Sequence, residues 1–366
     1  MKSIFIFFFL ISIGNTIFAQ IPENDQNWEV VFNQEFNSEA EFNSTFIRGW
    51  TGLNCLTHGL TNQSGCWPEL QLYKNENIVL NSGKLEILIK KENVFGKMID
   101  FSPNDLPPNH IMCDGLPNYR SFSYTSGAFR ATEKYFYGYY EINCKLPKGR
   151  GFWPAFWLHA DHDCGYGHEI DILEPSGAMM ENAIQYGANN HGRFYDPSAI
   201  NSPDHCTELA DGGVVNVLPM NQAFYSYSCE WLPSSIKYYY NNNSQPVRHY
   251  RGSMVPRSPR YLNINVAIDP FDNSKPNHLT PFPSKMEIDY IRYYTLKLDC
   301  NIEVVQSNFN FATHQYSVKK LYKLSNSLVP VGGRHTLRAT DYIELNSEFT
   351  VPLGAEFAII PTDICQ

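Results

Sequence analysis

Short runs in which apolar and polar side chains alternate recur along most of the chain. A period of two is the pattern of a strand with one buried and one exposed face. Turns rich in Gly, Asn and Pro separate these runs, and long helical periodicity is hard to find. We therefore predict strands at WEVVF (28–32), KLEILIKK (84–91), GYYEINCKL (138–146), HEIDILE (168–174), FYSYSCEWL (224–232), SIKYYY (235–240), YLNINVAI (261–268) and MEIDYIRYY (286–294).

Many short strands joined by turns predict an all-β fold, a two-sheet antiparallel sandwich. Composition supports this class of fold. Charged residues make up only 18% of the 366 residues and aromatic residues 14%. Such values exclude intrinsic disorder and argue against a helical bundle. The formal net charge of -9 argues against binding nucleic acid through a basic surface.

The N-terminus has the pattern of an export signal. Lys2 precedes an apolar run from Ile4 to Ile13, and the small residue Ala19 stands before Gln20. This arrangement predicts a cleaved signal peptide at residues 1–19, with an uncleaved anchor as the alternative. The run is shorter than the ~20 residues that span a membrane. We expect a secreted, periplasmic or cell-surface protein without a membrane span, and a monomer.

The composition changes after Leu298. The segment 299–366 contains no Trp and carries short strand-like runs between Gly and Asn turns. We predict a main domain at 20–298 and a small C-terminal β-domain at 299–366. The C-terminal domain resembles the C-terminal modules of exported bacterial proteins. This resemblance implies a stack of hairpin-like turns. The alternative is that this segment completes the main sandwich.

The nine cysteines are compatible with disulfides in an exported protein, and their odd number leaves at least one unpaired. We expect Cys55 to pair with Cys66, and Cys300 with Cys365. Cys144 and Cys229 lie inside predicted strands as buried thiols or as a cross-strand pair.

Three carboxylates lie in the strand HEIDILEP (168–175): Glu169, Asp171 and Glu174. Glu169 and Asp171 are two residues apart and share a face, whereas the odd step to Glu174 reaches the opposite face in a regular strand. A β-bulge would return Glu174 to the side of the other two. Clustered acids raise one another's pKa, which is costly for structure but useful for general acid chemistry on a glycosidic bond. The alternative is three solvated acids on an exposed face.

The chain resembles glycoside hydrolase family 16 over most of residues 28–295. HEIDILE matches the longer, bulged form of the family motif, as found in laminarinase- and agarase-like members, although His168 stands where many members have Gly. The upstream stretch YFYGYYEINCKLPKGRGFWPAFWL (135–158) also matches. Further matches are NQEFN (33–37), ELQLY (69–73), SGKLEI (82–87), CEW (229–231) and IDYIRYY (288–294).

The resemblance implies a curved β-jelly roll with an open substrate cleft and a retaining endo-hydrolase of β-linked polysaccharide. It assigns Glu169 as nucleophile, Glu174 as general acid and then base, and Asp171 as the residue that tunes both. No cofactor is expected for catalysis.

Aromatic and histidine side chains near this strand are candidates for sugar binding. Trp153 and Trp157 are four residues apart, so a regular strand places both on one face. Aromatic rings stack on the apolar faces of sugars, and the resemblance favours Trp153 for the subsite beside the cleaved bond. The alternative is that both are core residues. His191 lies one strand further on and either faces the cleft or belongs to a surface loop.

Two groups of residues are candidate metal ligands. HADHD contains His159, Asp161, His162 and Asp163, but we interpret it as a solvated loop. The resemblance implies a structural calcium ion away from the cleft, held by the backbone near Glu35, the carbonyl of Gly83 and the carboxylate of Asp289. Oxygen ligands suit calcium. For Asp289 a turn or salt-bridge role is the alternative.

Three functions remain open from the sequence. The first is hydrolysis of β-1,3- or mixed-linkage glucan, which the acidic chain mildly favours. The second is hydrolysis of an algal galactan such as agar, porphyran or carrageenan; sulfated galactans would favour basic residues in the cleft, and Arg150 and Arg193 lie near the motifs. The third is carbohydrate binding without catalysis, against which the three intact acids argue.

Overall fold

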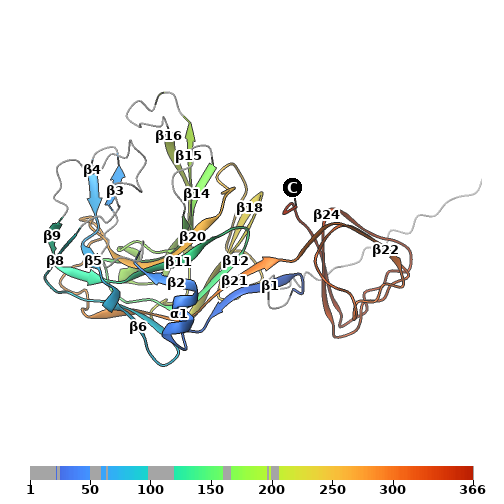
Figure 1. Ribbon diagram of the computed structural model, residues 1–366, viewed down its shortest axis with the longest axis horizontal. Helices are drawn as coiled ribbons and strands as arrows, with labels where there is room; N and C mark the ends of the chain where they lie inside the picture. The colour runs from blue at the N-terminus through green and yellow to red at the C-terminus, as the bar shows by residue number, and fades with distance from the viewer. Residues whose placement is uncertain are drawn as a thin grey trace, which may run out of the picture.

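Two antiparallel sheets form the body of the protein (Figure 1). The computed structural model describes residues 22, 25–49, 59–62, 65–97, 119–159, 166–195, 198 and 206–365. In the first sheet β1 pairs with β21, outside the main strand order. The other strands follow the order β19 (Arg248–Tyr250), β18 (Ser235–Tyr240), β17 (Tyr225–Leu232), β12 (Gly138–Lys145), β21 (Ser284–Leu296), β7 (Leu85–Ile89) and β6 (Ile78–Leu80), and β1 spans Trp28–Gln34.

The second sheet carries the acidic strand as an interior strand, two strands from one edge. Its order is β16 (Cys206–Asn216), β15 (Gln185–Tyr195), β14 (Tyr166–Glu174), β13 (Phe152–His159), β20 (Arg260–Ile268), β11 (Ala128–Tyr135) and β2 (Phe46–Arg48). Each of the eight strands predicted from the sequence is present in one of these two sheets. The expected two-sheet antiparallel sandwich is therefore confirmed.

The core lies between the two sheets and explains the alternation in the sequence. Ile142 and Tyr227 of the first sheet and Ile170 and Ile264 of the second belong to one buried cluster, and each is fully buried. Alternate side chains of a strand point to opposite faces. On β14, β13 and β20, the residues that alternate with the buried core residues therefore point away from the core. We call this side of the second sheet the cleft face; it carries Glu169, Asp171 and Glu174.

Shorter elements surround the sandwich. The helix α1 (Glu39–Thr45) begins at Ser38, whose hydroxyl accepts a hydrogen bond from the backbone N–H of Glu41, and it buries Phe42. None of the helices that the structure describes is long and apolar enough to cross a bilayer. The remaining short elements are β3 (Gly59–Asn62), β4 (Gly65–Pro68), β5 (Gln71–Tyr73), η2 (Asn75–Asn77), β8 (Val94–Lys97), β9 (Tyr119–Phe122), β10 (Tyr124–Ser126) and η3 (Met179–Glu181).

The C-terminal segment forms a separate four-stranded sheet with its own apolar core. All of its neighbouring strands run parallel, so the chain winds as a small solenoid rather than as hairpins. The expected hairpin-like turns are wrong, because a hairpin joins antiparallel neighbours. The strands are β22 (Leu298–Ser307), β23 (Val318–Ser325), β24 (Arg334–Leu345) and β25 (Glu356–Pro361).

This C-terminal solenoid packs against the sandwich beside β1 and β21 (Figure 1). Val318 shares a buried cluster with Trp28 and Tyr294 of the first sheet. Arg338 is fully buried, and its Nη2 lies 2.8 Å from the Oδ2 of Asp25. The solenoid thus neither completes a sheet of the sandwich nor stands free of it.

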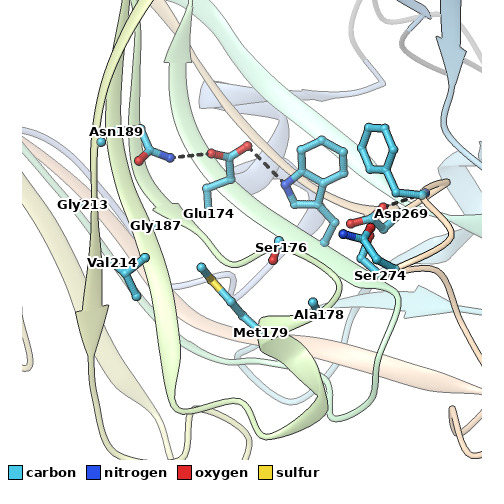
Figure 2. Close-up of a pocket in the computed structure, with 14 residues that line it drawn as sticks. Glu174, Ser176, Ala178, Met179, Gly187, Asn189, Gly213, Val214, Asp269 and Ser274 are labelled. Carbon is cyan, nitrogen blue, oxygen red and sulfur yellow. Dashed lines mark hydrogen bonds between the residues drawn. The ribbon is translucent and has the colours of Figure 1, made fainter.

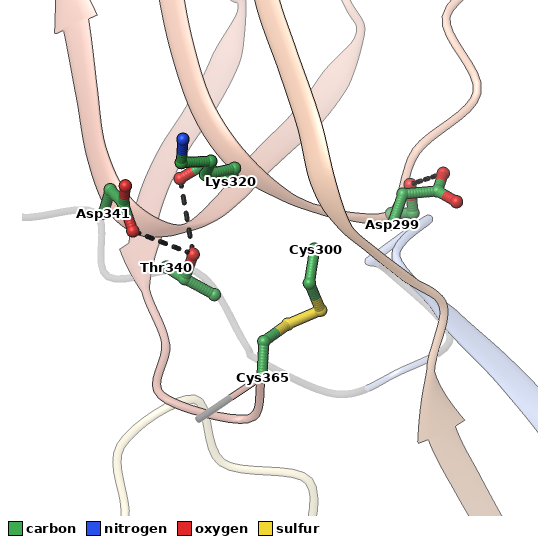
Figure 3. The surroundings of a disulfide bond; sticks show 7 residues. Asp299, Cys300, Lys320, Thr340, Asp341 and Cys365 are labelled. Carbon is green, nitrogen blue, oxygen red and sulfur yellow. Dashed lines mark hydrogen bonds between the residues drawn. A yellow bond between two sulfur atoms is a disulfide. The ribbon is translucent and has the colours of Figure 1, made fainter.

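Two of the cysteine predictions can be compared with the described residues. Cys300 and Cys365 form the expected disulfide, which ties the start of the solenoid to its end (Figure 3). Cys144 and Cys229 are both buried and free. They are not opposite each other in the sheet, because Cys144 lies opposite Tyr225 and Cys229 lies opposite Tyr140. The predicted pair of Cys55 with Cys66 and the signal peptide lie outside the residues whose side chains are described.

Candidate active site

The acidic strand β14 contains the bulge that the sequence predicts. Asp171 lies opposite Trp157, whereas Leu173 lies opposite Phe156, so one residue of β14 is left over between them. On the other side the pairing with β15 also shifts between Asp171 and Glu174. Ile172 and Leu173 are consequently both buried in the core. The extra residue returns Glu174 to the cleft face, beside Asp171.

Neighbouring strands surround the acids with polar and aromatic side chains. Residues directly opposite in an antiparallel sheet point to the same side. Glu169 lies opposite His159 on β13 and His191 on β15. His191 therefore faces the cleft, where its Nε2 lies 3.2 Å from the Oδ2 of Asp171. Asp171 itself is only 1% exposed.

Glu174 is held by two N–H donors. The indole Nε1 of Trp153 donates to one carboxyl oxygen at 3.2 Å, and the Nδ2 of Asn189 donates to the other at 2.8 Å. Figure 2 shows the Glu174 carboxyl group beside Asn189, with dashed lines marking the hydrogen bonds that it accepts. Because each oxygen has its own donor, the carboxyl group is fixed in orientation.

A cleft of about 460 Å³ opens beside Glu174. Trp153 and Phe271 form part of its wall, and backbone at Gly187, Gly212 and Gly213 forms another part. An added side-chain carbon at Gly212 would lie 2.3 Å from the Oδ1 of Asn189, so glycine is needed there to leave room for this amide. The cleft thus combines one carboxyl group, an aromatic surface and several hydrogen-bonding groups, as ligand sites commonly do.

The electrostatics favour a protonated Glu174 at neutral pH. Burial, followed by the neighbouring charge of Asp171, raises its pKa to about 8. The hydrogen bonds from Asn189 and Trp153 and the charge of His191 oppose this rise, because they stabilise the ionised form.

The pKa of Glu169 is also raised well above its usual range, again by burial first and by the charge of Asp171 next. Each glutamate makes ionisation of the other less favourable, so they lose their protons in two separate steps. Over the range between these steps the pair holds one proton. Because both pKa values are raised, the shifts alone do not assign that proton to Glu174; the family resemblance does. One carboxylate can then act as a nucleophile or base while the other donates a proton.

Trp157 lies on the same face as Trp153, four residues further along β13. It is half-buried, and its Nε1 donates a hydrogen bond to the Oδ1 of Asn265 at 2.9 Å. Its ring centre lies 5.5 Å from that of His159. Neither tryptophan belongs to the core cluster between the sheets. Their role in binding sugar remains a prediction.

Comparison with protein families identifies the domain. The model of glycosyl hydrolases family 16 matches residues 69–292, which is more than half of the chain. The chain belongs to glycosyl hydrolases family 16. The matched range includes both tryptophans and all three acids, as the resemblance in the sequence implied.

Individual family members are distant in sequence. The chain is 24% identical over 311 residues to the glucan endo-1,3-beta-glucosidase A1 of Niallia circulans, a match that covers 78% of the chain and 40% of that protein. It is 25% identical over 287 residues to the keratan-sulfate endo-1,4-beta-galactosidase of Sphingobacterium multivorum, a match that covers 75% of the chain and 57% of that protein. The chain thus spans about half the length of these curated relatives.

Solved structures of the family have the same fold. The catalytic domain of an endo-1,3-beta-glucanase (laminarinase) from Thermotoga petrophila superposes with a TM-score of 0.51 at 25% identity. The match covers 74% of this chain and 99% of the other. The part of this chain that the match does not cover is long enough to include the C-terminal solenoid.

The positions at which the family resemblance implies calcium lie on the first sheet and beside it. Lys84, which follows Gly83, places its Nζ 3.1 Å from the Oδ1 of Asp289. The carboxylate of Glu35 lies 3.1 Å from the Nη2 of Arg292. Both carboxylates are therefore already paired with cations, and no group of three or more acidic, His or Cys side chains in the described part of the chain could hold a metal. A calcium ion there remains a prediction.

Several residues of the site were missed in the sequence. Asn189 lies two residues before His191 on β15, so the same alternation that places His191 on the cleft face also places Asn189 there. Asp269 and Phe271 follow the end of β20, and the Asp269 carboxylate accepts hydrogen bonds from the backbone N–H groups of Gly177 and Phe271. No sequence pattern indicates that this loop lies beside β14.

The remaining residues singled out in the sequence either form ion pairs with neighbouring residues or lie outside the residues that the structure describes. Arg150 pairs with Glu181, with 3.4 Å between their charged atoms. Of the HADHD loop only His159 lies within the described residues. Asp161, His162 and Asp163 lie outside them, as do the side chains of His168 and Arg193.

Proposed function

We propose that the protein is a retaining endo-glycosidase that hydrolyses a β-linked polysaccharide, with β-1,3- or mixed-linkage glucan as the first candidate substrate. The observation that carries this proposal is the bulge in β14, which brings Glu174 to the same face as Glu169 and Asp171. Membership of glycosyl hydrolases family 16 and the glucan-degrading relatives support it. We further propose that the enzyme acts outside the cytoplasm, after removal of residues 1–19, and as a monomer.

The proposed reaction has two steps. In the first, the carboxylate of Glu169 attacks the anomeric carbon, and the carboxylic acid of Glu174 gives its proton to the departing glycosidic oxygen. The bond between sugar and leaving group breaks as the bond to Glu169 forms. In the second, the Glu174 carboxylate takes a proton from water, whose oxygen displaces Glu169. Two displacements at one carbon retain its configuration.

The surroundings of Glu174 and Asp171 suit these roles, and the charge of His191 opposes the rise in the pKa of Glu169. Trp153 and Asn189 hold the carboxyl group of Glu174 at the edge of the cleft. Its raised pKa of about 8 keeps the proton available at neutral pH. Asp171, buried between the two glutamates and close to His191, is placed to tune them. Trp153 also offers a ring for stacking on a sugar beside the cleaved bond.

A galactan is the second candidate substrate. It is favoured by the similarity to the keratan-sulfate endo-1,4-beta-galactosidase of Sphingobacterium multivorum, which is as close in identity as the glucanases. The two candidates share the same catalytic acids and differ in the side chains that contact the sugar away from the cleaved bond.

The test is a panel of laminarin, lichenan, agarose, porphyran, carrageenan and keratan sulfate, with products separated by size. The proposal expects internal cleavage of at least one of these by the wild-type chain and none by the Glu169→Ser variant, which should still bind the same polymer. Binding without cleavage by the wild-type chain would instead indicate a carbohydrate-binding protein. Equal cleavage by wild type and variant would refute the role of Glu169.

A further inference from the structure

A basic group lies on the cleft face, three strands from the acids. The register is continuous across the sheet: Asp171 lies opposite Trp157, Trp157 opposite Asn263, and Asn263 opposite Arg130. Directly opposite residues share a face, so Arg130 points to the same side as the catalytic acids. Three strand spacings of about 4.8 Å place it ~14 Å from β14. A few sugar units of a bound chain span that distance.

Arg130 is positioned by an aromatic ring. Its guanidinium carbon lies 4.0 Å from the ring centre of Tyr261, and the Nζ of Lys134 lies 5.0 Å from the same centre. Lys134 reaches this ring because the pairing of β11 with β20 shifts by an even number of residues, which keeps Lys134 and Arg130 on one face. Stacking on a ring fixes the plane of a guanidinium and leaves its hydrogen-bonding edge available.

The guanidinium of Arg130 also lacks an acidic partner. The chain has 37 acidic residues against 28 basic ones, so carboxylates are plentiful. Most described arginines use them, with the pairs Arg48–Glu39, Arg150–Glu181, Arg248–Asp211, Arg292–Glu35, Arg334–Glu356 and Arg338–Asp25. Among the described residues no carboxylate lies within ion-pair distance of Arg130, a half-buried residue whose buried Nε–H has no hydrogen-bond partner.

We infer that Arg130, with Lys134 beside it, forms a subsite for an anionic substituent, a sulfate ester or a carboxylate, on the polysaccharide. This inference rests on the proposed function for the location of the substrate. A neutral glucan has no group that requires an unpaired cation, and a half-buried charge without a partner is costly unless a ligand compensates it. The planar fork of a guanidinium binds two oxygens of one anion at once. Between the two candidate substrates of the proposed function, this subsite therefore favours an acidic β-linked glycan over a neutral glucan.

The test measures affinity, so that it does not depend on turnover. The full-length Glu169→Gln chain is titrated calorimetrically with keratan sulfate oligosaccharides, the same oligosaccharides after desulfation, and mannuronate oligosaccharides from alginate. We expect at least one anionic ligand to bind about tenfold more tightly than the desulfated one, which is the scale of one charge-assisted contact. A preference for keratan sulfate identifies a sulfate subsite, and a preference for mannuronate identifies a carboxylate subsite.

Adding Arg130→Gln should remove this preference, and Arg130→Lys should keep only part of it. Lys320→Gln is the matched control, because it removes one cation from the C-terminal solenoid, where Lys320 pairs with Glu303. The inference is overturned if the Arg130→Gln chain melts normally and retains the preference, if Lys320→Gln removes it equally, or if no anionic ligand is preferred at all.

The outcome for the proposed function is read separately from the turnover of the substrate panel by the wild-type chain. Cleavage of a neutral glucan together with no effect of Arg130 would retain the glycosidase and reject the subsite. An Arg130-dependent preference without any cleavage would retain the subsite and reject the glycosidase.

Discussion

Replacing Asn189 by Ala should move the alkaline limit of activity to higher pH. The amide of Asn189 donates to Glu174 at 2.8 Å, and this contact lowers the pKa of the glutamate, because it stabilises the ionised form. In the wild-type protein burial and Asp171 outweigh it and leave the pKa at about 8. Without the amide the proton should be held more strongly.

The size of this shift follows from the strength of the contact. A hydrogen bond to a charged group contributes about 1.5–3 kcal/mol, and one pKa unit corresponds to about 1.36 kcal/mol. Loss of the Asn189 donor should therefore raise the pKa of Glu174 by about one to two units. Since Glu174 acts as the acid in the first step, kcat/KM should decline with that higher pKa on the alkaline side.

The assay is the pH profile of kcat/KM on a soluble oligosaccharide, from pH ~5 to ~10.5, because this ratio reports the pKa values of the free enzyme. Trp153→Phe keeps an aromatic ring but removes the other donor to Glu174, and it should shift the limb in the same direction. Gln185→Ala is the control on the same strand, since the Gln185 side chain donates a hydrogen bond to the exposed Asn216 and not to Glu174, and it should leave the limb unchanged. An alkaline limb that stays in place or moves to lower pH in Asn189→Ala would refute the reasoning.

Three further outcomes test the stability side of the account. The unfolded chain loses the Glu174 proton near pH 4.5 whereas the folded chain keeps it to about pH 8, so wild-type stability falls as pH rises through this window. Glu174→Gln should therefore gain stability relative to wild type across the window, by about 4–5 kcal/mol at its upper end, and a melting difference that is constant with pH would contradict this. Arg338→Ala leaves Asp25 buried without its cation and should lower the free energy of unfolding by about 3–5 kcal/mol, without changing KM on a soluble substrate. The control Arg334→Ala removes a more exposed ion pair and should cost less than about 1 kcal/mol. Equal losses of melting temperature in the two variants would argue against the buried pair. Calcium should raise the melting temperature relative to EDTA, and Asp289→Asn should abolish the increase; identical melting with calcium and EDTA would reject the calcium site.

The sequence predicted the parts of the structure that depend on local periodicity. Alternation placed the strands, because one buried face requires an apolar residue at every second position. The odd step from Glu169 to Glu174 predicted the bulge, since three acids on one face required an extra residue in between. The disulfide between Cys300 and Cys365 also followed from the ends of one compact segment.

Features that depend on distant contacts were not predictable in this way. Alternation shows which face a residue occupies but not which strand lies beside it, so the parallel winding of the solenoid was mistaken for hairpins. Asn189 was missed because its partner, Glu174, is contributed by another strand. The docking of the solenoid through Arg338 and Asp25 joins residues 313 positions apart, which no local pattern indicates.

The most direct measurement is the identity of the residue that becomes covalently attached to the sugar. A 2-deoxy-2-fluoro glycoside of the sugar that the panel identifies, carrying a good leaving group, should accumulate as an ester on the protein, because fluorine slows both steps whereas the leaving group accelerates only the first. Peptide fragmentation should then locate the added mass on Glu169. An adduct on Glu174, or an active enzyme that forms no adduct while its products show inverted anomeric configuration, would contradict the account.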